Sequence, residues 1–425
     1  MKTTILLIAT AVLAFSQETA DTKMRQRAVR DLARGGQDSI PQIAPYVTDR
    51  DLSVRIEAVK VLAEIGGPKT LDPLLAAARD NDPEMQIRAT EGLVNVYLPG
   101  YTKTGIAGSL QRAGNSLRAK FGDTNDQVID EYVQVKPEVI QTLGRLAAGG
   151  SSLESRATAA RALGILRGQA ALPQLIEAIR SKDTIVMYEA LVAVQKIRDP
   201  AVGPDIEFRL KDLDERVQLV TVETTGILRN RAAAPQLRDV LEHTKSVKVR
   251  RAALTALSRL GDPADHPLFL RYLSEKDEVM RAAACEGLGR LGNPVDRATL
   301  ERFFSSERGL NARLSAGFGL VLLGNLDNTD FSPLRYLVNS LNQKSSKEAT
   351  RALLTELARD EKVRKAIYPL LTRATKDEKI QLAVIFARSG ERDSVQYLET
   401  LSVDPDVDVA QEGIRSLRTL RARLP

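Results

Sequence analysis

Hydrophobic and polar positions follow one pattern that returns along the chain about every thirty residues. A short polar residue opens each block, a Val-Arg pair or a variant of it follows, and an Ala/Leu-rich stretch runs to a turn before a second apolar stretch. Residues 247–274 and 278–305 show this pattern most clearly. The apolar stripe of 249–260 is wide enough for burial on two sides, whereas that of 170–181 is narrower. Each block therefore predicts a hairpin of two unequal helices.

The ends of these helices carry their own signals. Gly261 closes a first helix, where a left-handed backbone costs little, and Pro263 opens the next helix. Aspartates that can cap free N–H groups recur just before the first helices: Asp51, Asp82, Asp183, Asp214, Asp277, Asp377 and Asp406. Such hairpins bury their apolar faces only against one another, so we expect an all-α solenoid of about eleven or twelve stacked hairpins.

An arginine recurs in the Val-Arg pair that opens the first helices. The members of this set are Arg55, Arg88, Arg156, Arg250, Arg281, Arg313 and Arg351, and Tyr188, Gln218, Gln381 and Gln411 stand at the remaining positions. A row of arginines along one face would suit an anionic ligand. Because aspartates recur in register with them, we instead expect each arginine to meet an acid of its own or the next hairpin, as Asp277 with Arg281.

These blocks resemble the bacterial HEAT repeat, in the subtype named after phycobilisome lyases. The shared motif is D-x-x-V-R-x-x-A-x-x-A-L-x-x-L-G, with good copies at 51–65, 249–261 and 277–292. The resemblance covers roughly residues 22–425. It implies an armadillo/HEAT-like superhelix whose first helices line the concave face. It also implies a binding architecture with diverse partners, because this fold carries many unrelated functions.

The repeat spacing breaks once, between Arg88 and Arg156, which lie about two repeats apart. Residues 98–136 are either an insertion in one hairpin or a degraded repeat, between repeats at 22–97 and repeats at 137–425 of one continuous solenoid. Insertions in solenoids often lie on the binding face, where aromatic and arginine side chains dominate the energetics. The candidate partner contacts are Tyr101, Lys103, Arg112, Arg118, Lys120 and Tyr132.

The first residues have the pattern of a secretory signal. Lys2 precedes a mostly apolar stretch over 5–15, and small residues flank Phe15 before Gln17. We expect a signal peptide over 1–16 with cleavage near Ser16-Gln17, and a periplasmic or secreted protein. The stretch is short for a bilayer span, so no membrane span is expected after its removal. The net charge of +6, with acids interspersed, does not indicate a nucleic-acid ligand.

Residues for metal or nucleophilic chemistry are scarce. The chain has one cysteine, Cys285, and two histidines, His243 and His266, too few for a Cys/His metal cluster. Cys285 lies in an apolar run and is expected to be a buried structural thiol. No enzymatic activity, metal or cofactor is therefore expected.

Two short motifs resemble ligand sites without the required context. The glycines of 287–292 match G-x-G-x-x-G, but they lie at the end of a repeat helix rather than after a strand. The acids of 404–408 resemble the start of a calcium loop, but Val409 stands where a glycine is needed and Arg415 where a glutamate is needed. We interpret these acids as helix caps.

The sequence thus favours an exported scaffold that binds protein partners through the concave first-helix face and the 98–136 segment. The identity of the partner and the oligomeric state stay open. Two alternatives also remain. One is binding of an anionic cell-envelope polymer through the arginine rows. The other is a lyase-like or accessory role with a bound small molecule.

Overall fold

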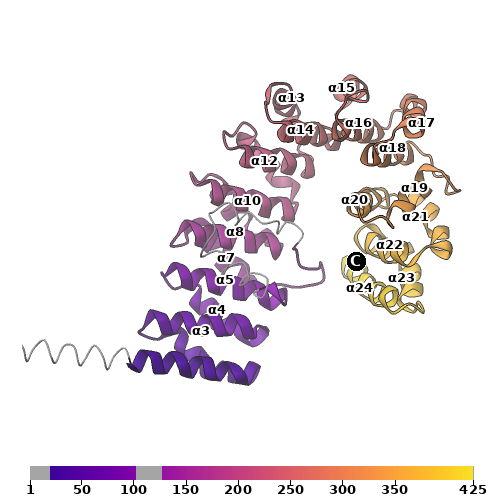
Figure 1. Ribbon diagram of the computed structural model, residues 1–425. Coiled ribbons are helices and arrows are strands. Elements are labelled where there is room, and N and C mark those ends of the chain that lie inside the picture. The colour runs from indigo at the N-terminus through magenta and orange to yellow at the C-terminus, as the bar shows by residue number, and fades with distance from the viewer. Residues whose placement is uncertain (1–19, 102–126, 425) are drawn as a thin grey trace, which may run out of the picture. The chain divides into compact units, whose positions relative to one another are not determined.

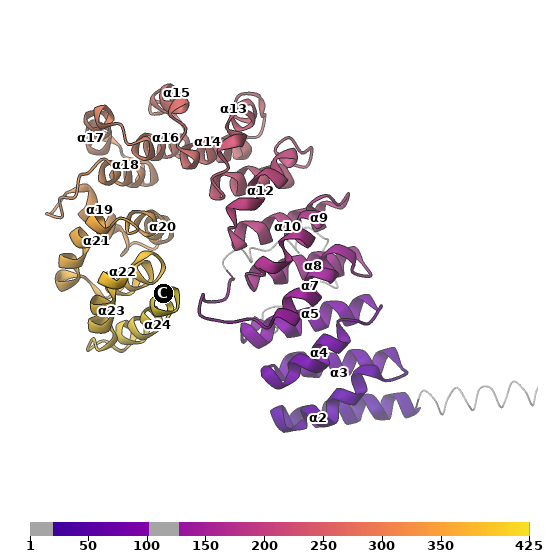
Figure 2. The same ribbon diagram turned by 180° about the vertical axis from the view of Figure 1, so that it is seen from behind.

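The computed structural model describes residues 20–101 and 127–424, and every regular element within these ranges is a helix. Two compact units form: unit 1 contains residues up to 129 together with 135–202, and unit 2 contains 130–134 together with 203 onward. In each unit, successive helices form hairpins (Figures 1 and 2). We name the first helix of a hairpin its A helix and the second its B helix. The predicted all-α solenoid is confirmed.

Unit 1 begins with an A helix over residues 20–32, and its apolar core lies between the helices, where Leu62, Leu93 and Leu163 are fully buried. The A helices α3, α5, α8 and α10 pack on one another in that order. The elements are α2 (Ile40–Ile43), α3 (Leu52–Ile65), α4 (Leu71–Ala77), α5 (Pro83–Tyr97), α7 (Pro137–Gly149), α8 (Leu153–Ile165), α9 (Leu172–Ile179) and α10 (Thr184–Ile197).

The interrupted repeat of unit 1 is a single hairpin with a long connection. Helix α5 packs directly on α8, and α7 packs on α8 and α9, so α7 is the B helix of the hairpin that α5 opens. The backbone N–H of Lys136, just before α7, donates to the hydroxyl of Tyr97 at the end of α5 at 3.1 Å. Residues 98–136 therefore lie between the two helices of one hairpin. Their central part, 102–126, lies outside the described residues.

Unit 2 continues the same arrangement. The B helices α13, α15 and α17 lie on the outer side of the A helices, and α20 lies on the inner side (Figure 1). Its helices are α11 (Gly203–Ile206), α12 (Glu215–Ile227), α13 (Ala234–His243), α14 (Val247–Leu260), α15 (His266–Tyr272), α16 (Glu278–Leu291), α17 (Arg297–Ser306), α18 (Leu310–Leu322), α19 (Pro333–Ser340), α20 (Lys347–Leu357), α21 (Glu361–Ile367), α22 (Lys376–Ser389), α23 (Val395–Ser402) and α24 (Val407–Arg423).

Short 3-10 turns lead into many B helices. They are η1 (Ala33–Ser39), η2 (Ala44–Thr48), η3 (Pro68–Thr70), η5 (Gln169–Ala171), η6 (Pro200–Val202), η7 (Glu207–Arg209), η8 (Arg231–Ala233), η9 (Pro263–Asp265), η10 (Pro294–Asp296), η11 (Tyr368–Arg373) and η12 (Arg392–Ser394). Among the helices that the structure describes, none is long and apolar enough to cross a membrane.

The helix caps follow the sequence pattern closely. The side chains that accept N–H groups at the start of A helices are Asp51, Asp82, Asp183, Asp214, Asp277 and Asp406. Asp377 differs, because it lies inside the first turn of α22 and Thr375 caps that helix in a capping box with Glu378. Gly261 ends α14 with φ 61°, and the apolar stripe of 249–260 is buried, as predicted.

Glycines permit a close contact between two A helices of unit 2. A Cβ atom on Gly289 of α16 would lie 2.4 Å from the Cα of Gly319 on α18, and one on Gly287 would lie 2.7 Å from the Phe269 ring. Gly292 closes α16 in the left-handed conformation with φ 69°. The three glycines of the G-x-G-x-x-G match therefore serve packing and a turn.

Candidate functional site

Arginines clamp neighbouring hairpins in a repeated geometry. Nη1 of Arg55 and of Arg281 donates to two backbone carbonyls of the loop before its own helix. Nε reaches forward to an acid of the next hairpin, from Arg55 to Asp80 at 2.9 Å and from Arg281 to Glu307 at 2.8 Å. The hydrogen bond between Arg281 and Glu307 raises the pKa of Arg281 and lowers that of Glu307. These arginines tie each repeat to the next.

The same geometry occurs on a B helix. Nη1 of Arg364 in α21 donates to two carbonyls before that helix, and its Nε donates to Asp393 of the next hairpin at 3.0 Å. The sequence suggested an ion pair between Asp277 and Arg281, but these two side chains bond other residues. The carboxylate of Asp277 accepts from Nε of Arg251 at 2.8 Å, while Arg281 takes Glu307.

The other repeat arginines lie in different environments. The side chain of Arg88 bonds Glu84 on its own helix at 2.7 Å, and that of Arg156 donates to the carbonyl of Ala147 at 3.4 Å. In α5 the position four residues after the cap holds Gln86, whose amide donates to the carbonyl of Asp80 at 2.8 Å. Gln86 also accepts the N–H of Ser151 at 2.9 Å and so makes the forward contact.

Three further repeat arginines, Arg250, Arg313 and Arg351, also differ in their surroundings. Arg250 is exposed. The guanidinium of Arg313 lies over the rings of Phe304 and Tyr336, at 4.9 and 4.7 Å from their centroids. Arg351 reaches Gln381 at 3.2 Å. The structure therefore places the repeat arginines in different environments rather than in one continuous row.

The candidate partner residues of the insertion are only partly described. Lys103, Arg112, Arg118 and Lys120 lie outside the described residues. Tyr101 belongs to unit 1 and follows α5, where its N–H donates to the carbonyl of Leu98. Tyr132 is grouped with unit 2, where its hydroxyl donates to Asp130 at 3.1 Å and the guanidinium of Arg418 lies 5.6 Å from its ring centroid.

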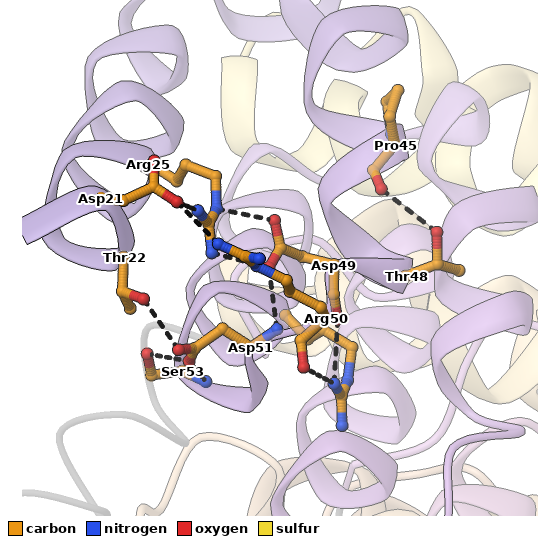
Figure 3. A network of polar contacts seen from close by, with 10 residues as sticks. Asp21, Thr22, Arg25, Pro45, Thr48, Asp49, Arg50, Asp51 and Ser53 are labelled. Atoms are coloured by element: carbon orange, nitrogen blue, oxygen red, sulfur yellow. Dashed lines mark hydrogen bonds and ion pairs between the residues drawn. The ribbon is translucent and has the colours of Figure 1, made fainter. Parts of the chain in front are cut away.

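A polar network covers the N-terminal hairpin and the loop after it (Figure 3). Nε of Arg25 donates to Asp49 at 3.0 Å, and Arg50 donates to Asp21 at 2.9 Å. The hydroxyl of Thr22 donates to Asp51 at 2.9 Å. Hydrogen bonds from Ser53 and then Thr22 lower the pKa of Asp51. These groups satisfy one another and join the first two A helices.

A second network, which the sequence did not single out, lies on the inner side of unit 2. Nε and Nη2 of Arg290 on α16 donate to Glu356 on α20 at 3.0 and 2.8 Å, and Nη1 donates to Glu286 at 2.9 Å. Arg229, just after α12, also donates to Glu356 at 2.8 Å. With Arg259 on α14, these five residues form what we name the inner charged cluster.

Burial strengthens the interactions of the inner charged cluster. The side chain of Arg290 is 9% exposed, and its guanidinium lies 4.8 Å from the ring centroid of Phe318. Burial alone disfavours the charged arginine, but the bond to Glu356 and the charge of Glu286 leave the pKa of Arg290 raised. Burial likewise opposes ionisation of Glu356, and Arg290 holds its pKa below the usual value. The pair is therefore ionised.

Arg259 is the exceptional member of the inner charged cluster. Within the described ranges it makes no hydrogen bond or ion pair, although Glu286 and Glu356 act on it through their charges. Burial is the largest influence and leaves the pKa of Arg259 lowered. A guanidinium presents five N–H donors in a fork that matches a carboxylate. Among the described residues, no carboxylate is hydrogen-bonded to the donors of Arg259.

The structure gives no support to a metal or thiol site in the ranges it describes. No group of three or more His, Cys, Asp or Glu residues is placed there to hold a metal ion. Asp404 accepts from Lys379 at 2.7 Å, and Asp406 caps α24. Cys285 is buried, and burial raises the pKa of its thiol well above the usual value.

Comparisons with solved structures return several proteins of low sequence identity to this chain. An engineered protein is 17% identical over 90% of this chain and 98% of its own, with a TM-score of 0.40. The complex of CpcE and CpcF of phycocyanin lyase from Nostoc sp. PCC7120 is 17% identical over 63% and 92%, with a TM-score of 0.37. Importin beta is 14% identical over 95% and 66%, with a TM-score of 0.40.

The comparison with protein families gives a direct assignment. The model for HEAT repeats matches residues 9–94, 140–224, 204–270 and 234–320, which together make up more than half of the chain. No curated protein matches the chain in sequence. The gap between the first two matches contains the insertion of 98–136. The resemblance predicted from the repeated motif is confirmed, and this chain belongs to the HEAT-repeat family.

Proposed function

We propose that this protein is an exported, non-enzymatic scaffold that binds partner proteins through the A-helix side of unit 2. A stack of hairpins offers an extended surface whose exposed positions can change without disturbing the packing. The observation that carries the proposal is Arg259, a charged group among the acids of the inner charged cluster that has no direct partner in the part of the chain that the structure describes. A carboxylate of a partner protein would complete its hydrogen bonds.

The fold does not require the inner charged cluster to hold neighbouring repeats together. The clamps of Arg55 and Arg281 already tie neighbouring repeats without it. Buried ion pairs add little net stability, because desolvation offsets most of the attraction. A network that joins α16 and α20 and leaves one guanidinium available is better suited to recognition than to holding the stack together.

Export is the second part of the proposal. Its support is the pattern of Lys2, the apolar stretch of 5–15 and the small residues before Gln17. The N-terminal sequence of protein recovered from a bacterial host tests it. Recovery from the envelope or medium with Gln17 at the N-terminus is the expected result, and intact Met1 in the cytoplasm would contradict export.

The binding proposal is tested by capture from an envelope extract with the full chain and with Arg259→Gln as baits. Arg302→Gln is the matched control, because Arg302 is an exposed arginine of the B helix α17 whose side chain bonds the carbonyl of Ala298 on its own helix. We expect a partner captured by the wild type and the control, and retained about tenfold less by Arg259→Gln. Equal capture by all three baits would remove Arg259 from the binding site.

A third bait tests the insertion. Residues 99–135 are replaced by a short linker, which the contact between Tyr97 and Lys136 makes geometrically simple. We expect the helicity of this variant to match the wild type and the captured partner to be lost or weakened. If the partner is retained in full, the insertion has no part in recognition, and the site lies on the A helices alone.

A further inference from the structure

A short described part of the 98–136 segment lies on the last A helix of unit 2. Residues 130–134 are grouped with unit 2, and Nη2 of Arg415 on α24 donates to both carboxylate oxygens of Asp130, at 2.9 and 3.1 Å. The guanidinium of Arg418 lies 5.6 Å from the centroid of the Tyr132 ring, within the range of a cation–π contact. Each of these two arginines therefore meets one side chain of the segment.

The helix displays these two arginines as a pair. Residues three positions apart lie on the same face of a helix, so Arg415 and Arg418 are neighbours, and both are exposed. Ile414 lies about one turn before Arg418 and is 52% exposed, which places an apolar side chain beside the guanidinium groups. We name the surface of Ile414, Arg415 and Arg418 the α24 face. It offers cationic and apolar contacts together.

The segment presents its two contacting side chains in a fixed arrangement. The hydroxyl of Tyr132 donates to the carboxylate of Asp130 at 3.1 Å, so the two groups that meet α24 also hold each other. The N–H of Val133 donates to the carbonyl of Asp130 at 3.0 Å and closes a turn between them. The segment therefore has the form of a small ligand with one acid and one aromatic ring.

The contact between the segment and α24 lies largely in solvent. The side chains of Arg415 and Asp130 are 57% and 31% exposed, and exposed ion pairs add little stability because water competes for both charges. The neighbouring pair of Glu131 and Arg423 is longer still, at 3.8 Å. Salt and competing charged ligands weaken contacts of this kind. The segment can therefore leave α24 without the loss of a buried core.

We propose that residues 130–134 are an internal ligand of the α24 face and reversibly block it against acidic segments of partner proteins that carry an aromatic residue. The internal ligand itself identifies this chemistry, with a carboxylate for Arg415 and a ring for Arg418. Because the segment is covalently attached, its local concentration exceeds that of a free competitor, and it occupies the face by default. This inference rests on the proposed scaffold function and adds regulation to it, through residues outside the inner charged cluster.

A structural explanation predicts something different. Arginines near the C-terminus of a helix are favoured by the helix dipole, and the segment would then serve only to stabilise the last hairpin. An open variant, Asp130→Asn with Tyr132→Ala, separates the two explanations. An internal ligand on the surface can be lost with a change in Tm of less than about 2 °C. A structural segment would cost more than about 4 °C.

The experiment measures binding of a fluorescein-labelled peptide with the sequence of 127–136 to the full chain, by fluorescence anisotropy at low salt. In the wild type the internal segment competes with the peptide. We therefore expect the open variant to bind the peptide at least about tenfold more tightly than the wild type. A peptide with the same residues in scrambled order is the control for general charge attraction, and we expect it to bind the open variant at least about tenfold more weakly.

Arginine substitutions locate the binding on the α24 face. In the open variant, Arg415→Gln together with Arg418→Gln should weaken peptide binding at least about tenfold. Arg421→Gln is the matched control, because Arg421 is an exposed arginine of α24 whose side chain bonds Glu399 of α23. This control should change Kd less than about twofold.

Four results would overturn the inference. The first is equal binding of the peptide, or none, by the wild type and the open variant. The second is unchanged binding after the substitution of Arg415 and Arg418, the third is equal binding of the scrambled peptide, and the fourth is an open variant with the Tm loss of a structural segment. If one of these occurs while capture of a partner still depends on Arg259, this inference falls and the proposed function stands.

Discussion

Arg250 and Arg281 occupy the same repeat position, four residues after the helix cap, but among the described residues only the side chain of Arg281 has bonding partners. Arg281 holds Glu307 and two loop carbonyls, whereas Arg250 is exposed. We expect Arg281→Ala to lower the free energy of unfolding by about 2 kcal/mol and Arg250→Ala to change it by less than about 0.5 kcal/mol. Urea denaturation followed by circular dichroism measures both. Equal losses would mean that the clamp contributes nothing specific.

Glu356 offers a second comparison between single residues. It bonds Arg290 and Arg229 in the inner charged cluster, whereas Glu399 bonds Arg421 at the surface. We expect Glu356→Gln to lower the free energy of unfolding by about 1–3 kcal/mol, because Arg290 keeps only Glu286. Glu399→Gln should change it by less than about 0.5 kcal/mol. An equally small effect of both would show that the inner cluster is as weakly coupled as a surface pair.

Helix packing is most sensitive where α16 and α18 meet through Gly289 and Gly319. A Cβ atom at Gly289 would lie 2.4 Å from backbone, so the helices must separate. We expect Gly289→Ala to lower the Tm measured by calorimetry and to destabilise the fold by about 1–3 kcal/mol. Gly149→Ala, at the end of α7 with open space around it, is the control and should be neutral or slightly stabilising. A neutral Gly289→Ala would contradict the close contact.

The sequence predicted the elements well because their signals are local. Capping aspartates, the left-handed Gly261 and the apolar stripe of 249–260 each depend on neighbours within a few residues, and all three were found. The exact register was less predictable. The repeat pattern pointed to Arg88, but in α5 Gln86 makes the contacts that arginine makes in the clamps of Arg55 and Arg281. The amide of Gln86 replaces the guanidinium group there.

The inner charged cluster could not be predicted from the sequence. Glu356 lies 66 residues from Arg290 and 127 from Arg229, and their approach depends on how the A helices of unit 2 are arranged. A periodic pattern gives the order of the hairpins but not which distant helices meet.

For the molecule as a whole, the carboxylates set the response to acid. Hydrogen bonds lower the folded-state pKa of Glu307, Asp51 and Asp404 below their usual values. The contribution of these three carboxylates to stability is complete above their unfolded-state pKa, which is near 4. It is lost as the pH falls through their lower pKa values in the folded state. Asp265 acts in the opposite sense, because burial raises its pKa.

Three of these four groups have a lowered pKa, and Asp265 has a raised one. We therefore expect the free energy of unfolding, measured in urea, to fall between about pH 5 and pH 3. Urea midpoints measured across this range check the sign. The Asp51→Asn variant should show a smaller dependence on pH, because it removes one titrating group with a lowered pKa. A midpoint that rises on acidification would contradict the assignment.

The hydrogen bond between Tyr97 and Lys136, together with the one between Gln86 and Ser151, has an evolutionary consequence. Both ends of the 98–136 segment meet at one point, and the repeats on either side remain joined without it. Segments of other lengths and compositions can therefore be exchanged there while the stack keeps its register. Replacement of this one loop can give the same stack a new binding specificity. Binding peptides can also be inserted at this position by design.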